Sequence, residues 1–288
     1  MILIPIFAAI LFILIFLYYD KKYRKTSYYK VTKQSYLSVL NNSGRYGEYL
    51  AFKKLEKLEN SGAKFLFNVY IPKANGETTE IDMLMISSKG IFVFEIKNYS
   101  GWIFGDENQK NWYQTLPAGK RKSHKEVFYN PIMQNESHVN HLYKFIKGSS
   151  SIYSVVVFSD KCTFKDIQIS GSNSGLVYLS QLDEFVSNIL NQSNDVVLDE
   201  NRIISIYDAL YPCSQTSMEQ KAQHIKNVQA SKIPHDKEIS NNFQNLQCPQ
   251  CGGSLVLRTS KKGANAGNQF YGCSNYPKCK YIRNIKYY

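Results

Sequence analysis

Three charged residues, Asp82, Glu95 and Lys97, interrupt two apolar, β-rich runs between residues 80 and 97. Two carboxylates on one face of an apolar hairpin repel each other unless a cation lies between them. A divalent cation suits such a pair, because Mg²⁺ needs only one or two protein carboxylates when a phosphate supplies further oxygen ligands. The ammonium of Lys97 would then lie beside the metal-bound water. These residue types indicate a metal site at which water could act on a bound phosphate.

The same stretch predicts a β-hairpin, since a short polar turn ending in glycine joins its two runs. A loop of residues 88–89 places Asp82 opposite Glu95, whereas a loop of residues 89–90 places Asp82 opposite Lys97. In both registers the three charges share one face, because side chains alternate along a strand. A three-residue loop would break this arrangement, and Glu-x-Lys alone also occurs by chance.

The size and charge of the chain narrow the class of its partners. It has 288 residues and a mass of 33.2 kDa, which allows one sizeable core and an appendage. Its formal net charge is +12 and its sequence pI is about 9.2. This excess of positive charge favours a polyanionic partner, either nucleic acid or anionic lipid, and does not choose between them.

Residues 2–19 contain no charged side chain, and a basic segment follows from residue 21. This length is close to the minimum for a membrane-spanning helix. A cleaved signal peptide is one alternative, although the stretch lacks a basic beginning and a small-residue cleavage site; a buried core helix is another. We expect a retained single-pass anchor at the cell membrane. Because positive charge flanks only its C-terminal side, the N-terminus should lie outside and the body in the cytoplasm.

Patterns of apolar residues predict an α/β (α+β) fold, in which helices flank a mixed β-sheet. Besides the central hairpin, strands are expected at residues 64–71, 101–105, 111–115, 151–158 and 175–179. Helices are expected at residues 41–60, 131–146, 181–190 and 199–210. The first helix opens with Gly44 and Gly47, and two glycines in a first turn indicate a close approach to another backbone or to a phosphate.

The order and spacing of several motifs resemble the nuclease-related domain (NERD) family. The matching residues are Gly44, Gly47, Glu48, Glu80 to Asp82, Glu95 to Asn98, Gly101, Asn130, Pro131 and Gln134, within about residues 43–158 or as far as 189. The resemblance implies a restriction-endonuclease-like core of the PD-(D/E)XK class. It also implies that Asp82 and Glu95 hold Mg²⁺ (or Mn²⁺) and that Lys97 orients or activates water and stabilises charge on the phosphate. Glu48 would support the metal, and Gln134 would position substrate or water.

Four of the six cysteines, Cys248, Cys251, Cys273 and Cys279, lie near the C-terminus. Their pairing, with Cys-x-x-Cys first, predicts a closed tetrahedral Zn²⁺ site with four thiolate ligands. Two disulfides are the alternative, which the spacing and the expected cytoplasmic side disfavour. The segment resembles the C-terminal four-cysteine zinc fingers of bacterial type IA topoisomerases. That resemblance implies binding to DNA, single-stranded DNA in particular.

Basic and aromatic side chains surround these cysteines, and single strands are held by stacking beside a basic groove. We expect DNA contacts from Arg258, Lys261, Lys262, Tyr276, Lys278 and Lys280 in this segment, and from Lys120, Arg121 and Lys122 in a basic run of the body. Most basic runs are solvated surface. The one in the body, however, lies between the predicted sheet and the next helix, where phosphate contacts are within reach.

The predicted order of domains follows from these segments. It is a transmembrane anchor at residues 1–20, a basic juxtamembrane segment at 21–40, a NERD nuclease-like domain at 41–212, a polar linker at 213–246 and a zinc ribbon-like finger at 247–288. We expect a membrane-anchored, divalent-metal-dependent nuclease that hydrolyses DNA. A non-catalytic, membrane-associated DNA-binding or tethering protein and an RNA-processing nuclease stay open as alternatives.

Overall fold

The chain divides into two compact units, residues 1–224 and 225–288, and the division falls inside the predicted linker. The structure, a computed structural model, describes residues 3–73, 75–117, 119, 123–147, 151–169, 174–192, 196–217, 222–224, 226–227, 248, 250–253, 255–259 and 269–284. Each unit has its own core of buried side chains.

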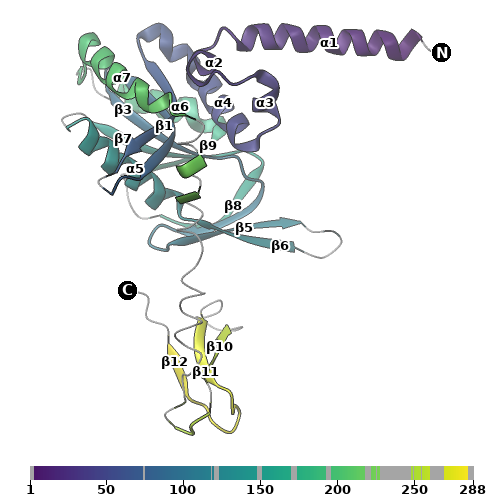
Figure 1. The fold of residues 1–288 in the computed structure, drawn as a ribbon, viewed down its shortest axis with the longest axis vertical. Helices are drawn as coiled ribbons and strands as arrows, with labels where there is room; N and C mark the ends of the chain where they lie inside the picture. The colour runs from purple at the N-terminus through teal and green to yellow at the C-terminus, as the bar shows by residue number, and fades with distance from the viewer. Residues whose placement is uncertain are drawn as a thin grey trace. The chain divides into compact units, whose positions relative to one another are not determined.

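The first unit is a mixed α/β structure with helices flanking β-sheets, as predicted (Figure 1). Its helices are α1 (Leu3–Tyr23), α2 (Ser27–Thr32), α3 (Tyr36–Leu40), α4 (Ser43–Leu55), α5 (Pro131–Phe145), α6 (Leu182–Asn191) and α7 (Glu200–Ser214), with 3-10 turns at Glu56–Ser61 and Leu179–Gln181. Its strands are β1 (Lys64–Pro72), β2 (Thr78–Ser87), β3 (Gly90–Lys97), β4 (Gly101–Asp106), β5 (Asn111–Pro117), β6 (Ser123–Tyr129), β7 (Ile152–Phe158), β8 (Cys162–Gln168) and β9 (Ser174–Tyr178).

The central hairpin consists of β2 and β3, and Ser87 pairs with Gly90 across a two-residue turn. This is the first of the two predicted registers, and it carries Asp82 and Glu95 to facing positions. Gly90 has φ +130, and a Cβ built there would lie 2.4 Å from a backbone carbonyl oxygen. Both the backbone conformation and the available space therefore require glycine at the turn.

The main sheet has five strands in the order β1-β2-β3-β7-β9. β1, β2 and β3 are antiparallel neighbours, whereas β7 and β9 run parallel to β3. β7 is apolar on both faces, because Val155 and Val157 join the main core and Val156 and Phe158 join a second core. A strand in the interior of a sheet is expected to read in this way.

The second core lies beneath a four-stranded sheet with the order β6-β5-β4-β8. Its central side chains include the fully buried Ile103 and Trp112. The sequence predicted β4 and β5, but not β6 or β8. These two strands have polar, exposed sequences, with six of the seven residues of β6 exposed, and so lack the apolar run that predicts a strand.

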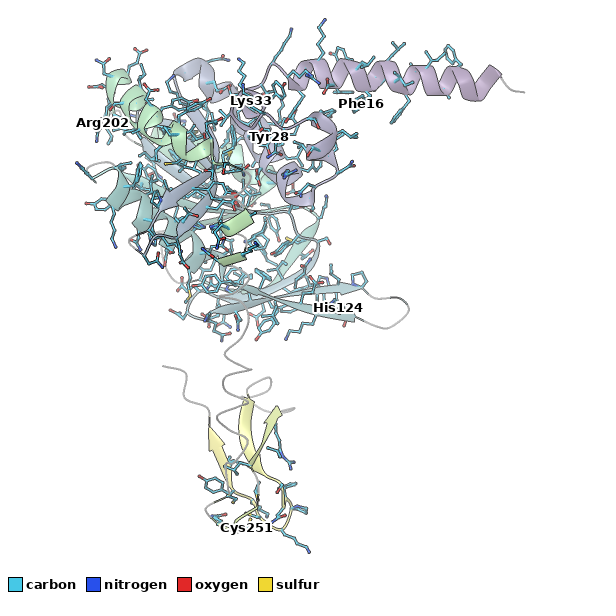
Figure 2. The ribbon with its side chains drawn as sticks, in the orientation of Figure 1. Phe16, Tyr28, Lys33, His124, Arg202 and Cys251 are labelled. Carbon is cyan, nitrogen blue, oxygen red and sulfur yellow. The ribbon has the colours of Figure 1, made fainter. Side chains whose placement is uncertain are left out.

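The segment predicted as basic and juxtamembrane, residues 21–40, contributes to the main core. Tyr28 of α2 is fully buried, and its ring lies 4.7 Å from that of Phe67 (Figure 2). Tyr23, the last residue of α1, is 1 % exposed, and its hydroxyl donates to the Gln34 carbonyl at 2.9 Å. The C-terminal end of α1 is therefore anchored in the folded body.

The prediction of a transmembrane helix at residues 1–20 is not supported. In the part of the chain that the structure describes, no helix has both the length and the apolar character needed to cross a membrane. The last turns of α1 hold Asp20, Lys21 and Lys22 before the helix enters the body at Tyr23. The expected location at the cell membrane stays a prediction.

The second unit contains a three-stranded antiparallel sheet with the order β10-β11-β12. The strands are β10 (Leu255–Thr259), β11 (Gln269–Cys273) and β12 (Ile282–Asn284). Its small core consists of Leu255 and three of the cysteines. Such a core buries little apolar surface, so a bound metal is needed to stabilise a unit of this size.

Candidate functional site

The three charged residues of the central hairpin come together on β2 and β3. Glu95 is 1 % exposed, and its Oε1 accepts a hydrogen bond from the Lys97 ammonium at 2.5 Å. Asp82 Oδ2 accepts a hydrogen bond from the Ile96 amide at 2.8 Å. Because Ile96 lies between the other two residues, this bond fixes Asp82 against the strand that carries them.

Another predicted residue, Gln134, reaches the same place from α5. Its Oε1 accepts a hydrogen bond from Lys97 Nζ at 3.2 Å. The ammonium of Lys97 is therefore held between a carboxylate and an amide oxygen. Two side chains from different elements fix the position of this cation.

Asn130 determines where α5 begins. Its Oδ1 accepts hydrogen bonds from the amides of residues 132 and 133, which is the usual role of an N-cap asparagine. Its Nδ2 lies within hydrogen-bond distance of the carbonyl oxygens of residues 106, 107 and 109, in the turn between β4 and β5. Asn130 is fully buried. The helix that carries Gln134 is therefore tied to the four-stranded sheet at its first turn.

His138 also contacts the site, and sequence reasoning missed it. Its Nε2 lies 3.2 Å from Glu95 Oε2, and its Nδ1 lies 2.7 Å from the hydroxyl of Thr79. His138 follows Gln134 by four residues, a spacing that places both side chains on one face of a helix. The four-residue spacing from Gln134 is the signal by which the sequence could have identified His138. A histidine within a helix does not by itself indicate a role at a site.

Glu48 lies on α4 and is buried. Its Oε2 accepts hydrogen bonds from Asn68 Nδ2 at 2.9 Å and from the Tyr28 hydroxyl at 3.2 Å. Burial raises the pKa of Glu48 to about 7, although the Asn68 hydrogen bond opposes the shift. The influence of Glu48 on Asp82 is electrostatic, since its charge helps to raise the pKa of that carboxyl.

The burial of charged groups sets the protonation of the site. Burial raises the pKa of Asp82 well above its usual range, and the charge of Glu95 adds to the effect. Burial also acts to raise the pKa of Glu95, but Lys97 and His138 outweigh it and the net shift is downward. Burial acts to lower the pKa of Lys97, and the charge of Glu95 reverses this so that the pKa rises. The site therefore pairs an ionised Glu95 with a protonated Lys97.

The donor set at this site fits a hard divalent cation. Among the described residues, Glu95 Oε2 and His138 Nε2 are buried without a hydrogen bond of good geometry. A buried carboxylate oxygen without a hydrogen bond costs free energy unless a cation or a water molecule binds to it. Asp82 offers a second carboxylate, and oxygen donors are what Mg²⁺ and Mn²⁺ prefer. In the described part of the chain, three metal-ligating side chains gather only at the four cysteines. A cation here would thus take its remaining ligands from water or substrate.

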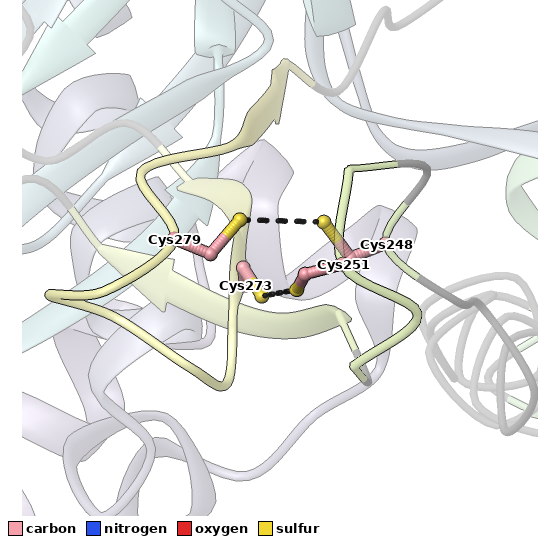
Figure 3. A group of neighbouring side chains, drawn as sticks. All are labelled: Cys248, Cys251, Cys273 and Cys279. Atoms are coloured by element: carbon pink, nitrogen blue, oxygen red, sulfur yellow. Dashed lines mark hydrogen bonds between the residues drawn. The ribbon is translucent and has the colours of Figure 1, made fainter.

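The four cysteines of the second unit form a compact cluster (Figure 3). Their sulfur atoms all lie within 4.8 Å of one another, with Cys248 and Cys279 3.7 Å apart and Cys251 and Cys273 3.3 Å apart. All four are free thiols rather than disulfides. The cluster supports the predicted structural zinc site, and the hydrogen bond from the Gly253 amide lowers the pKa of the Cys251 thiol to about 6.

The predicted DNA contacts of this unit are described in part. Tyr276, Lys278 and Lys280 are exposed, and Tyr276 is 59 % exposed. The Arg258 guanidinium lies 5.7 Å from the centre of the Tyr276 ring and donates to the Cys273 carbonyl at 3.3 Å. The remaining predicted contacts, Lys120, Arg121, Lys122, Lys261 and Lys262, lie outside the described residues.

Comparison with known proteins decides the family of the first unit. Residues 43–159 match the nuclease-related domain. An uncharacterized protein of Bacillus anthracis is 30 % identical over 183 residues, which cover 64 % of this chain and 82 % of that protein. The chain belongs to the nuclease-related domain family. The predicted resemblance is therefore confirmed, over nearly the range expected from the motifs. No solved structure matches the chain.

The second unit of this NERD protein matches the topoisomerase DNA-binding C4 zinc finger at residues 246–288. A DNA topoisomerase 1 of Helicobacter pylori is 44 % identical over 155 residues, which cover 54 % of this chain and 17 % of the topoisomerase. A DNA topoisomerase 1 of Methanocaldococcus jannaschii is 45 % identical over 49 residues, 17 % of this chain and 6 % of that enzyme. The chain thus spans only a small part of the topoisomerases, and the zinc-finger resemblance is confirmed.

Proposed function

We propose that this NERD protein is a divalent-metal-dependent nuclease that hydrolyses DNA phosphodiester bonds. The observation that carries the proposal is the group formed by Asp82, Glu95, Lys97 and Gln134, in which two carboxylates adjoin an ammonium held at 2.5 Å and 3.2 Å by its two partners. Opposite charges so arranged suit a phosphodiester, because the carboxylates attract a metal ion and the ammonium attracts a phosphate oxygen.

Each side chain has a distinct task in the proposed reaction. Asp82 and Glu95 would hold Mg²⁺ or Mn²⁺, which when bound supplies a water of lowered pKa and polarises a phosphoryl oxygen. The ammonium of Lys97 would supply positive charge toward the phosphate and orient or activate the attacking water. Gln134 limits the movement of that charge, and Glu48, when ionised, would add negative charge near Asp82.

The zinc-binding unit of the chain suggests DNA binding, and we propose that it prefers single strands. The exposed Tyr276 offers a ring for stacking, and the exposed Lys278 and Lys280 offer charge for phosphates. Stacking beside positive charge holds single strands without reading their sequence. In this proposal the two units share one polymeric substrate, with binding in the second and hydrolysis in the first.

The test is cleavage of single- and double-stranded DNA by the purified full chain with Mg²⁺ or Mn²⁺. Glu95→Ala should abolish cleavage and leave most of the DNA binding, whereas Glu136→Ala, which removes an exposed carboxylate from α5, should cut like the wild type. Binding without cleavage by the wild type would favour a DNA-tethering role instead. Preferential cleavage of RNA in competition would favour RNA processing.

A further inference from the structure

The outward face of the four-stranded sheet carries aromatic and basic side chains. Across β4, β5 and β6 the register pairs Trp102 with Thr115 and Thr115 with Lys125, while Phe104, Tyr113 and Val127 form the next row. Paired residues point to the same side of a sheet. The opposite side chains, such as Trp112, form the second core. The outward face of the sheet is therefore separate from the face that packs against the second core.

This face is exposed, although it is rich in large apolar side chains. Trp102 is 51 % exposed, Val127 61 % and Tyr129 40 %. Tryptophan normally buries most of its surface, so an exposed one beside further apolar side chains marks an interaction site.

Two lysines lie over the aromatic rings of this face. Lys165 Nζ on β8 lies 5.1 Å from the centre of the Trp102 ring, and Lys125 Nζ on β6 lies 3.8 Å from the centre of the Tyr113 ring. The two lysines come from opposite edges of the sheet, roughly 14 Å apart by strand spacing. The acidic residue of β8, Asp166, pairs with Phe104, whereas Trp102 pairs with the uncharged Thr163.

The pattern of charges and rings selects the ligand. Bases stack on aromatic rings and phosphates pair with ammonium groups, so alternating rings and lysines suit a single strand of nucleic acid. RNA-recognition modules use the same kind of surface, a four-stranded sheet whose exposed aromatics stack two or three bases. A duplex would not offer its base faces to such a surface.

The face also begins next to the candidate nuclease site. Trp102 follows Lys97 by five residues, so the two lie at most about 17 Å apart along the chain. We infer that the outward face of the β4-β5-β6-β8 sheet is a stacking platform for single-stranded nucleic acid, with Trp102 as its main ring and Lys125 and Lys165 as its phosphate contacts. This inference depends on the proposed function only in taking nucleic acid as the substrate.

The test uses the full chain carrying Glu95→Ala, so that bound nucleic acid stays intact, and a short fluorescein-labelled oligothymidylate. Trp102→Ala should weaken binding by about 5- to 100-fold, the range found when one stacking ring is removed. Trp102→Phe should restore most of the affinity, because phenylalanine keeps a ring. Tyr143→Ala, which removes a 52 % exposed ring from α5, should bind like its parent.

Tryptophan fluorescence gives a readout that binding at the zinc-binding unit cannot supply. The chain has two tryptophans, Trp102 at the surface and Trp112 fully buried. A base stacked on Trp102 should quench the emission of the Glu95→Ala protein, whereas the Trp102→Phe variant, which retains only Trp112, should show no quenching.

Two results would overturn the inference. The first is unchanged affinity of Trp102→Ala together with unquenched emission. The second is a Trp102→Ala protein that binds normally but sediments as a smaller species, since the face would then join two copies of the chain. Neither result would change the expected dependence of cleavage on Glu95. Failure of the stacking platform and failure of the proposed nuclease are therefore distinguishable.

Discussion

Glu48 shows how one buried carboxyl links stability to pH. Its pKa is about 7 in the folded protein and 4.5 as an ordinary glutamic acid, so the folded state retains a proton that the unfolded state loses. The contribution of Glu48 to stability therefore falls as pH rises from 4.5 to 7, by about 3 kcal/mol at most.

Glu48→Gln removes this titration. Relative to the wild type, the variant should gain up to about 3 kcal/mol of stability at pH 8 and little at pH 4.5, measured by urea unfolding. Glu136→Gln, at an exposed position of α5, serves as the control and should show no such gain. An equal difference between Glu48→Gln and wild type at both pH values would contradict the prediction.

His138 is expected to hold Glu95 in place for metal binding. His138→Ala should weaken Mn²⁺ binding and slow cleavage, each by about 10- to 100-fold, as is usual when the partner of a metal-binding side chain is removed. Titration calorimetry with Mn²⁺ measures the first effect without requiring activity. His141→Ala, on the same helix but facing Ser137, should leave both unchanged. Equal losses in the two variants would argue for a general effect on α5.

At the scale of elements, the two glycines that open α4 differ in their role. A Cβ built on Gly47 would lie 2.8 Å from Asn98 Cβ, whereas one built on Gly44 would meet nothing closer than 3.4 Å. The prediction of a close approach therefore holds for Gly47 alone, where α4 packs against the chain that leaves β3.

Gly47→Ala should destabilise the protein by about 1–3 kcal/mol, because α4 must move away from Asn98. Gly44→Ala should be neutral or stabilising by up to about 1 kcal/mol, since alanine favours a helix. Urea unfolding of the two variants checks both signs. A similar loss in both would contradict the prediction and show that a methyl group is not tolerated at Gly44 either.

The elements that sequence patterns predict best are those that bury one face or both. The central hairpin could be predicted to within two registers, because glycine at the turn and alternating side chains leave few choices. β6 and β8 could not, since most of their side chains are exposed and neither has an apolar run typical of a strand. The contact between His138 and Glu95 also escaped prediction, because it depends on how α5 crosses the sheet.

At the scale of the whole molecule, two units with separate cores should respond separately to loss of metal. A zinc-selective chelator, or Cys279→Ser, should unfold the second unit, because its few buried side chains cannot replace four metal–sulfur bonds. The first unit should keep its stability.

Hydrogen exchange followed by mass spectrometry measures both units in one sample. Amides of β10 and β11 should lose protection after chelation, while those of β2 and β3 should stay protected. Cys162→Ser, a substitution at a buried cysteine of the first unit, provides the reverse comparison. Loss of protection in β2 and β3 on chelation would show that the first unit depends on zinc as well.

Asn130 has a consequence for how this domain can vary among its relatives. One buried side chain caps the helix of Gln134 and His138 and also reaches three carbonyl oxygens of the turn between β4 and β5. Any insertion in that turn would withdraw the carbonyl oxygens and release the start of the helix. Length changes between β4 and β5 should therefore be selected against among the relatives of this domain.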